Sequence, residues 1–170
     1  QEIVKVKKKN LVVGAAVGTN TEDIERAKSL IINGCDLIVI DTAHGHSKKV
    51  LNTLTKLKKI DNSVPICVGN VATAEAAKRL YNYGADIIKV GIGPGSICTT
   101  RMVSGIGVPQ ISAIMDVKQA LKNKKIKIIS DGGIKFSGDI AKALAAGADA
   151  IMMGSIFAGT DESPGKKFKY

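Results

Sequence analysis

Short apolar runs alternate with longer amphipathic stretches along nearly the whole chain. The apolar runs show no alternation with polar residues, which is typical of parallel strands covered on both faces. They predict six strands, at Leu11–Val17, Asp36–Ile40, Ile66–Val68, Asp86–Val90, Lys127–Ile129 and Ala150–Met153. The stretches between them predict helices at Thr21–Asn33, Lys48–Ile60, Ala74–Tyr83, Ile111–Asn123 and Gly138–Ala146.

One pattern, a glycine followed by a small residue and an aspartate, recurs where a predicted helix gives way to a predicted strand. It occurs at Gly34-Cys35-Asp36, Gly84-Ala85-Asp86 and Gly147-Ala148-Asp149. The glycine supplies the left-handed conformation that ends a helix, and the small residue lets helix and strand approach each other. Repeated junctions of one kind indicate repeated βα units with right-handed crossovers.

Polar or glycine-rich residues follow several of the predicted strands. Six βα units fit either a doubly wound open sheet or part of a barrel. In a barrel these residues meet at one mouth, whereas an open sheet would spread them across its width. No Gly-x-Gly-x-x-Gly follows the first strand. We therefore predict an α/β fold of the (β/α)8 TIM-barrel type.

The length conflicts with a complete barrel, because 170 residues fall short of the roughly 250 that this fold needs. We expect residues 1–170 to form a partial TIM-barrel catalytic domain with about six βα units, corresponding to barrel strands 3 to 8. Such a piece would expose unpaired edge strands and part of its core.

Composition excludes several classes of protein. At 45% hydrophobic residues the chain can build a core, and no apolar run approaches a membrane span. The net charge of +10 comes mainly from lysines, with three arginines, 4% aromatics and no tryptophan, so nucleic acid is not expected as the main partner. Three cysteines without paired spacing and no signal-peptide pattern predict a reducing, cytoplasmic setting.

The last two predicted strands lead into glycine loops, Asp131-Gly132-Gly133 and Gly154-Ser155. Glycines there expose backbone N–H groups, which bind phosphate at a helix start or in a nest. Phosphate sites after the last two strands recur in barrel enzymes. The pair predicts a phosphate site, although each loop alone would also suit a tight turn.

The segment 91–107 is the longest irregular stretch, and long structureless loops in compact domains are usually functional. Cys98 lies in it, and nearby backbone donors and Arg101 could lower its pKa and make it a nucleophile. Cys35 and Cys67 lie among apolar residues and are expected to be inert.

Other polar residues end predicted strands. Asp41 and Asp131 could each accept hydrogen bonds from both hydroxyls of a ribose, and Asn70 could add an amide at the same mouth. His44 and His46 lack a third ligand with metal-site spacing, so contacts to a bound molecule are the better interpretation.

Together these motifs resemble the IMP dehydrogenase family. The segment from Gly93 to Arg101, followed by Gly105-Ile106-Gly107-Val108-Pro109-Gln110, resembles the family's catalytic loop. The similarity extends over most of residues 11–165, and the loop at residues 41–46 resembles the bacterial members. Matching segments follow in the family's order: Val12–Gly18, Asp41–His46, Gly69–Thr73, Ser130–Ile134, Gly154-Ser155 and Ala158–Gly165.

The resemblance implies oxidation of IMP to XMP with reduction of NAD⁺. Cys98 would add to C2 of the base, with Thr100 as a second catalytic residue, and water would hydrolyse the resulting thioimidate. The implied IMP-binding residues are Ser96, Asp131, Gly132, Gly133, Gly154 and Ser155.

The resemblance also implies an NAD⁺ site, a K⁺ ion and a homotetramer. Carbonyls of Gly93, Gly95 and Cys98 would hold K⁺, with further ligands from a neighbouring subunit. The implied NAD⁺-binding residues are Asp41, Thr42, Ala43, Asn70, Gly91, Ile92 and Gly93.

Two alternatives stay open. GMP reductase, which deaminates GMP to IMP with NADPH, shares the cysteine loop. It differs where this chain has Gly107-Val108-Pro109-Gln110 and Gly154-Ser155, and it has a cysteine-containing loop after Asp-Gly-Gly. A non-catalytic purine-nucleotide-binding fragment is the other. The family's two earlier barrel strands, CBS regulatory module and arginine-bearing flap have no counterpart in these residues, so the 170-residue chain is expected to be poorly active alone.

Overall fold

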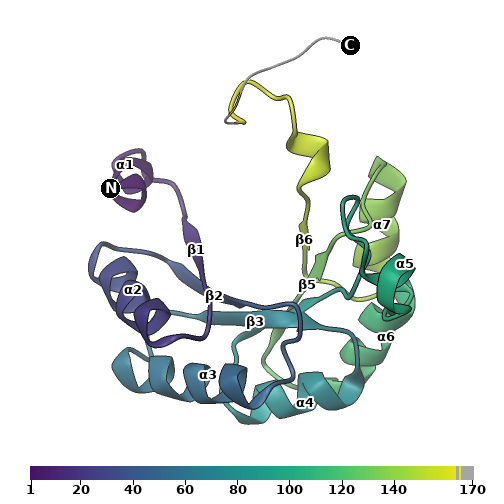
Figure 1. The fold of residues 1–170 in the computed structure, drawn as a ribbon, viewed down its shortest axis with the longest axis horizontal. Helices are drawn as coiled ribbons and strands as arrows, with labels where there is room; N and C mark the ends of the chain where they lie inside the picture. Colours follow the sequence, from purple (N-terminus) through teal and green to yellow (C-terminus); the bar gives the residue numbers. More distant parts are fainter. Residues whose placement is uncertain (164, 166–170) are drawn as a thin grey trace.

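The computed structural model describes residues 1–163 and 165, and its centre is one curved parallel sheet (Figure 1). Its strands lie in chain order, each paired in parallel with the next. They are β1 (Gly14–Val17), β2 (Leu37–Asp41), β3 (Ile66–Val71), β4 (Ile87–Val90), β5 (Lys127–Asp131) and β6 (Ala150–Met152). A doubly wound sheet reverses strand order at a switch point, and this sheet does not. The predicted α/β fold, part of a (β/α)8 barrel, is confirmed.

The longer helices line the convex side of the sheet, and the concave side faces the open space in Figure 1. Side-chain caps start some of them: Ser47 accepts a hydrogen bond from the Val50 N–H, and Thr73 accepts one from the Ala76 N–H. The helices are α1 (Glu2–Lys7), α2 (Thr21–Ile32), α3 (Lys48–Ile60), α4 (Ala74–Asn82), α5 (Thr100–Ser104), α6 (Gln110–Ala120), α7 (Ser137–Ala145) and the 3-10 helix η1 (Ser155–Phe157).

The main core lies between the sheet and its helices. Alternate strand residues such as Ile38, Ile88 and Ile128 pack there against Leu54 and Leu80. The intervening strand residues point to the concave side, because successive side chains of a strand face opposite ways. Some of these are also buried, among them Val39, Cys67 and Lys89.

The aspartates of the repeated junctions have a shared structural role. Asp86 donates its backbone N–H to the carbonyl of Ile66, and its carboxylate accepts the Ile66 N–H at 2.7 Å and the Lys58 ammonium at 2.6 Å. This joins the start of one strand to the start of the next and fixes their register. The same arrangement joins Asp36 to Val13 and Lys7, and Asp149 to Ile128 and Lys127.

The structure corrects two expected boundaries. The first strand begins at Gly14 rather than Leu11, and Leu11 and Val12 are exposed because no neighbouring strand covers them. The segment 91–107 is not wholly irregular, since α5 forms within it and ends at Gly105 in the left-handed conformation. Within the described residues, no helix is long and apolar enough to cross a bilayer.

Candidate active site

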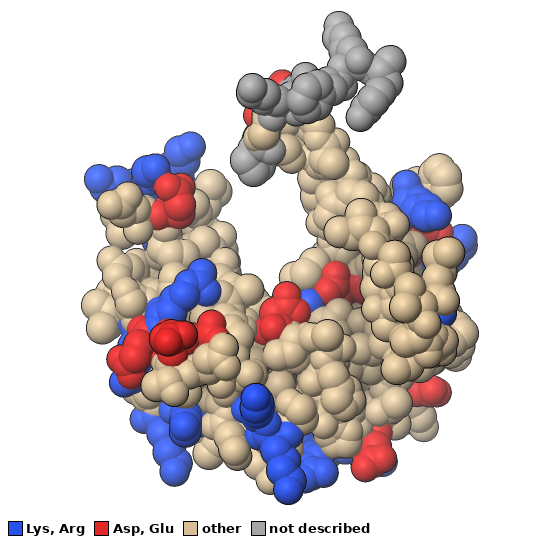
Figure 2. All heavy atoms as spheres, in the orientation of Figure 1, with Lys and Arg blue, Asp and Glu red and all other residues tan. Residues whose placement is uncertain are grey.

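The carboxyl ends of β2 to β5 surround a cavity of about 980 Å3, which we call the mouth cavity. Figure 2 shows the hollow on the concave side of the sheet, with acidic side chains on its floor. The cavity has the size of a typical small-molecule site. Polar and reactive side chains that line it include Asp41, Thr42, Asn70, Lys89, Cys98, Thr100 and Asp131.

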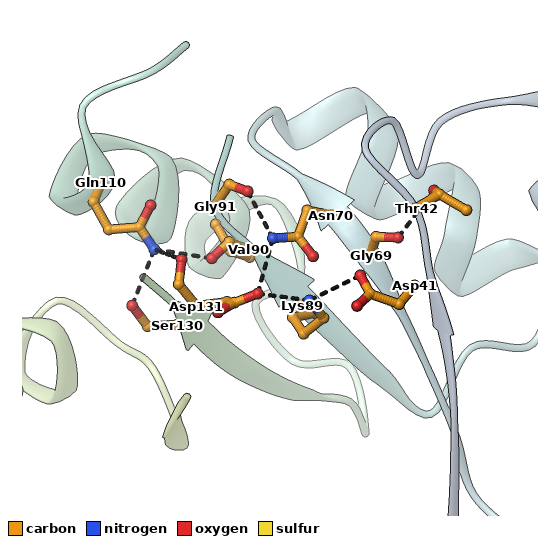
Figure 3. A network of polar contacts seen from close by, with 10 residues as sticks. All are labelled: Asp41, Thr42, Gly69, Asn70, Lys89, Val90, Gly91, Gln110, Ser130 and Asp131. Carbon is orange, nitrogen blue, oxygen red and sulfur yellow. Dashed lines mark hydrogen bonds and ion pairs between the residues drawn. The ribbon is translucent and has the colours of Figure 1, made fainter. Parts of the chain in front are cut away.

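Lys89 lies at the centre of the cavity floor, between two carboxylates (Figure 3). Its ammonium is 2.6 Å from Asp131 Oδ2 and 3.1 Å from Asp41 Oδ1, and its side chain is 2% exposed. Burial disfavours the charged form, but the hydrogen bond and charge of Asp131 and the charge of Asp41 outweigh it. The pKa of Lys89 is therefore raised, which favours the ammonium form at the bottom of the site.

Asn70 joins the loops above this ion pair. Its Nδ2 donates to the carbonyl of Gly91 at 2.7 Å and to Asp131 Oδ2 at 3.0 Å, while its backbone N–H donates to the carbonyl of Thr42 at 2.9 Å. Asn70 Oδ1 is buried and has no hydrogen-bond partner within the described part of the chain. Buried polar atoms are normally hydrogen-bonded, so this oxygen is an exception within the described residues.

Cys98 is half-buried beside the cavity, just before α5. Its Sγ lies 3.2 Å from Thr100 Oγ1, in hydrogen-bond contact. Hydrogen bonds from the Thr100 side chain and backbone favour the thiolate and lower the pKa of Cys98, with a smaller contribution from the charge of Arg101. Burial instead raises the pKa of Cys67 to about 12. Cys35 and Cys67 are both buried, as predicted.

Arg101 mainly holds the loop together. Its guanidinium donates to the carbonyls of Ile92, at 3.3 Å, and of Val108. A Cβ at Gly93 would lie 2.7 Å from Arg101 Cγ, and one at Gly107 would lie 2.5 Å from Arg101 Nε. Glycine at both positions therefore gives the arginine room between the two ends of the loop that carries Cys98.

The two predicted phosphate loops lie on neighbouring strands, since Asp131 pairs with Met152. Gly132 lines the mouth cavity and packs on the cysteine loop, where a Cβ would lie 3.0 Å from Pro94 Cγ. Gly154 and Ser155 start the short η1. Of the other residues that the resemblance assigns to ligands, Ala43, Gly91, Ile92, Gly93 and Gly95 line the mouth cavity. Ser96, Gly133, Gly154 and Ser155 are not among the described residues that line it.

Two site residues escaped the sequence reasoning. The signal for Lys89 is a lysine inside the apolar run Ile87–Val90. Gln110 belongs to the segment that resembles the family's catalytic loop, but the sequence assigned it no role. Its Nε2 donates to the carbonyl of Val90 at 2.9 Å and to Ser130 Oγ at 3.0 Å, which ties the start of α6 to the ends of β4 and β5.

Two kinds of group could hold the expected K⁺ ion: side chains of the site and backbone carbonyls of the cysteine loop. In the described part of the chain, no group of three or more His, Cys, Asp or Glu side chains could hold a metal. His44 and His46 contact each other edge-on, with ring centroids 6.4 Å apart. The carbonyl of Gly95 accepts the Cys98 N–H at 3.1 Å and keeps a second lone pair. Carbonyl oxygens of this kind are the donors that the expected K⁺ would take, and the K⁺ ion stays a prediction that depends on the backbone of this loop.

Comparison with known proteins gives consistent results. A profile of the IMP dehydrogenase / GMP reductase domain matches residues 1–170. The chain is 59% identical over 156 residues to an inosine-5'-monophosphate dehydrogenase of Rhizobium tropici, with 92% of this chain and 31% of the relative aligned. An enzyme of the same name from Bacillus subtilis is also 59% identical, with 92% and 32% covered.

A solved GMP reductase variant of Trypanosoma brucei, in complex with guanosine 5'-monophosphate, superposes with a TM-score of 0.89 at 49% identity. The alignment covers 92% of this chain and 33% of that one. The chain thus spans about a third of the length of the curated relatives it matches. The parallel barrel strands and the cysteine loop agree with the profile, which matches residues 1–170. This chain therefore belongs to the IMP dehydrogenase / GMP reductase family.

Proposed function

We propose that this chain carries the reaction centre of an IMP dehydrogenase, which oxidises IMP to XMP with NAD⁺ in guanine nucleotide biosynthesis. One observation carries the proposal: Cys98, a thiol with a lowered pKa, shares one cavity with two carboxylates on either side of a buried lysine. A thiolate supplies the nucleophile, and carboxylates can accept the hydroxyls of two ribosyl ligands.

In this proposal Cys98 attacks C2 of the hypoxanthine ring. Thr100, in hydrogen-bond contact with Sγ, favours the thiolate before the attack. Water then hydrolyses the thioimidate and releases XMP. Asp131 accepts the ribose hydroxyls of IMP. Ser96 helps hold the base, and the glycine loops Gly132-Gly133 and Gly154-Ser155 bind the phosphate.

In this proposal the dinucleotide binds on the side of the cavity that Asp41 lines, and IMP binds on the side of Asp131. Asp41 offers a half-exposed carboxylate to the dinucleotide, and Asn70 also lines the cavity. When bound, NAD⁺ supplies the acceptor for the hydride that leaves C2. The proposed NAD⁺-binding residues are Asp41, Thr42, Ala43, Asn70, Gly91, Ile92 and Gly93.

The remaining parts of the proposal concern the ion and the assembly. Carbonyls of Gly93, Gly95 and Cys98 would hold K⁺ and so fix the loop that carries the nucleophile. The protein would act as a cytoplasmic homotetramer. Its partners would then be IMP and XMP together with copies of the same chain.

GMP reductase is the second candidate, because solved structures of that enzyme superpose closely on this chain. Two segments of this chain favour the dehydrogenase, Gly107-Val108-Pro109-Gln110 and Gly154-Ser155. In GMP reductases the matching segments resemble Gly-Tyr-Pro-Gln and Gly-Gly.

Steady-state kinetics on the protein's full natural chain separates the candidates. Production of NADH from IMP and NAD⁺ is the expected result. Oxidation of NADPH with GMP, and no turnover of IMP with NAD⁺, would establish the reductase instead. Nucleotide binding without turnover of either pair would favour a non-catalytic binding module.

A further inference from the structure

Lys89 forms ion pairs with two carboxylates, which come from different strands and, in the proposed function, bind different ligands. Asp41 ends β2 on the dinucleotide side, and Asp131 ends β5 on the nucleotide side. Figure 3 shows the ammonium between them, with Asn70 adding a second hydrogen bond to Asp131. The two proposed ligand sites therefore share one cation.

Each carboxylate meets Lys89 with one oxygen. Asp131 uses Oδ2 for both Lys89 and Asn70, and its Oδ1 has no hydrogen-bond partner in the described part of the chain. Asp41 uses Oδ1. The side chains are 24% and 49% exposed respectively, so both still reach the cavity. The second oxygen of each group is thus oriented for a ligand by the contact of the first.

The ammonium has little freedom to move. The side chain is 2% exposed, and it passes over Gly69, where a Cβ would lie only 2.6 Å from Lys89 Cβ. The neighbouring Cys67 remains a neutral thiol, because its pKa is about 12. No competing anion therefore draws the ammonium toward β3, and its position is set by Asp41 and Asp131 together.

We propose that Lys89 is a positioning residue that orients the carboxylates of both ligand sites at once, so that the nucleotide and dinucleotide sites depend on a single buried cation. The inference rests on the proposed function, which assigns Asp131 to the nucleotide and Asp41 to the dinucleotide. Its consequence is specific: loss of the cation weakens both ligands, even though Lys89 contacts neither carboxylate oxygen that faces them.

The test measures the affinities for IMP alone and for NAD⁺ alone by titration calorimetry, using the protein's full natural chain. Lys89→Gln keeps hydrogen-bonding capacity but removes the charge, and should weaken both ligands at least tenfold. Lys89→Arg restores the charge and should stay within about threefold of the unmodified protein for both. The matched control is Lys127→Gln, which removes a strand lysine paired with Asp149 at the opposite end of the sheet, and it should change neither affinity.

Asp41→Asn gives a second measurement that does not depend on the folding of Lys89→Gln, because Lys89 keeps Asp131 as its partner. The ammonium is then held by Asp131 alone, so the Asp131 carboxylate loses the position that the two carboxylates and the cation set together. Affinity for IMP should fall about threefold or more, although Asp41 is not assigned to IMP.

The outcomes are distinguishable. An unmodified protein that binds neither IMP nor NAD⁺ overturns the proposed function, and the inference with it. If the unmodified protein binds both ligands but Lys89→Gln weakens the binding of only one of them, or of neither, the inference alone is overturned. Equal losses in the Lys127→Gln control, or unchanged IMP affinity in Asp41→Asn, contradict it as well.

Discussion

The two ends of the sheet use the same residue types, aspartate and lysine, in opposite ways. At the amino ends of the strands, which we call the base, Asp36, Asp86 and Asp149 each have a lysine and a backbone N–H of their own. At the mouth, Asp41 and Asp131 share the single ammonium of Lys89. The base is electrostatically complete without a ligand, whereas the mouth keeps free carboxylate oxygens. In barrels, the amino end stabilises the fold and the carboxyl end carries the chemistry.

Asp131→Asn should produce the largest difference between the two ends. An amide offers one uncharged acceptor oxygen in place of two charged ones, so it binds the ribose hydroxyls more weakly and kcat/KM for IMP should fall at least about a hundredfold. The matched change at the base, Asp86→Asn, should leave kcat/KM per folded molecule within about twofold. Equal loss of activity in the two variants would show that the ends do not differ in function.

The reactivity of Cys98 at the mouth can be compared in the same way with that of the buried Cys67. Cys98 should react with iodoacetamide with a midpoint below the ordinary pKa of 9.0, because Thr100 stabilises its thiolate. Thr100→Val should move that midpoint upward. Cys67, with a pKa of about 12, should stay unmodified across the same pH range, which peptide mapping by mass spectrometry checks. A Cys98 midpoint that does not respond to Thr100→Val would assign the shift to another cause.

Asp86→Asn should destabilise the fold even though it spares activity. The side chain bonds both Lys58 and the Ile66 N–H and is 40% exposed, so we expect a loss of about 1–2 kcal/mol in the free energy of unfolding. Urea denaturation followed by circular dichroism measures this value. A stability equal to that of the unmodified protein would mean that strand pairing does not depend on the junction aspartates.

The smallest expected effect is on the acid limb of stability. The hydrogen bond from Lys7 lowers the pKa of Asp36. Burial opposes such a shift in Asp149, but Lys127 and the Ile128 N–H outweigh it, so its pKa is also lowered. A lowered folded-state pKa adds stability that is complete above the unfolded-state value of about 3.9 and is lost as pH falls through the folded-state value. Unfolding free energies below about pH 4 should therefore fall less steeply in Asp36→Asn and Asp149→Asn.

The fold could be predicted from sequence because its signals are local. Apolar runs located all six strands, and the repeated glycine-small-aspartate junctions indicated their shared connection. The role of the aspartates could not be predicted in the same way. Which N–H and which lysine each carboxylate meets depends on the register between strands, and apolar runs without alternation carry no pattern that would specify the register.

The site was predictable to the extent that strand ends converge. Asp41, Asn70, Cys98 and Asp131 do line one cavity. Lys89 was missed because a lone lysine in an apolar run does not reveal its partners, which come from strands 42 and 48 residues away. The helix α5 was missed because Thr100–Ser104 is too short to show a hydrophobic period.

The central claim, that Cys98 is a nucleophile facing a bound purine nucleotide, is tested most directly by covalent labelling. A 6-halogenated IMP analogue should form one adduct, which tandem mass spectrometry would place on Cys98, and excess IMP should prevent it. Cys98→Ser should abolish the adduct and leave reversible IMP binding. An unmodified Cys98 in protein shown to bind the analogue, or an adduct on another cysteine, would contradict the account.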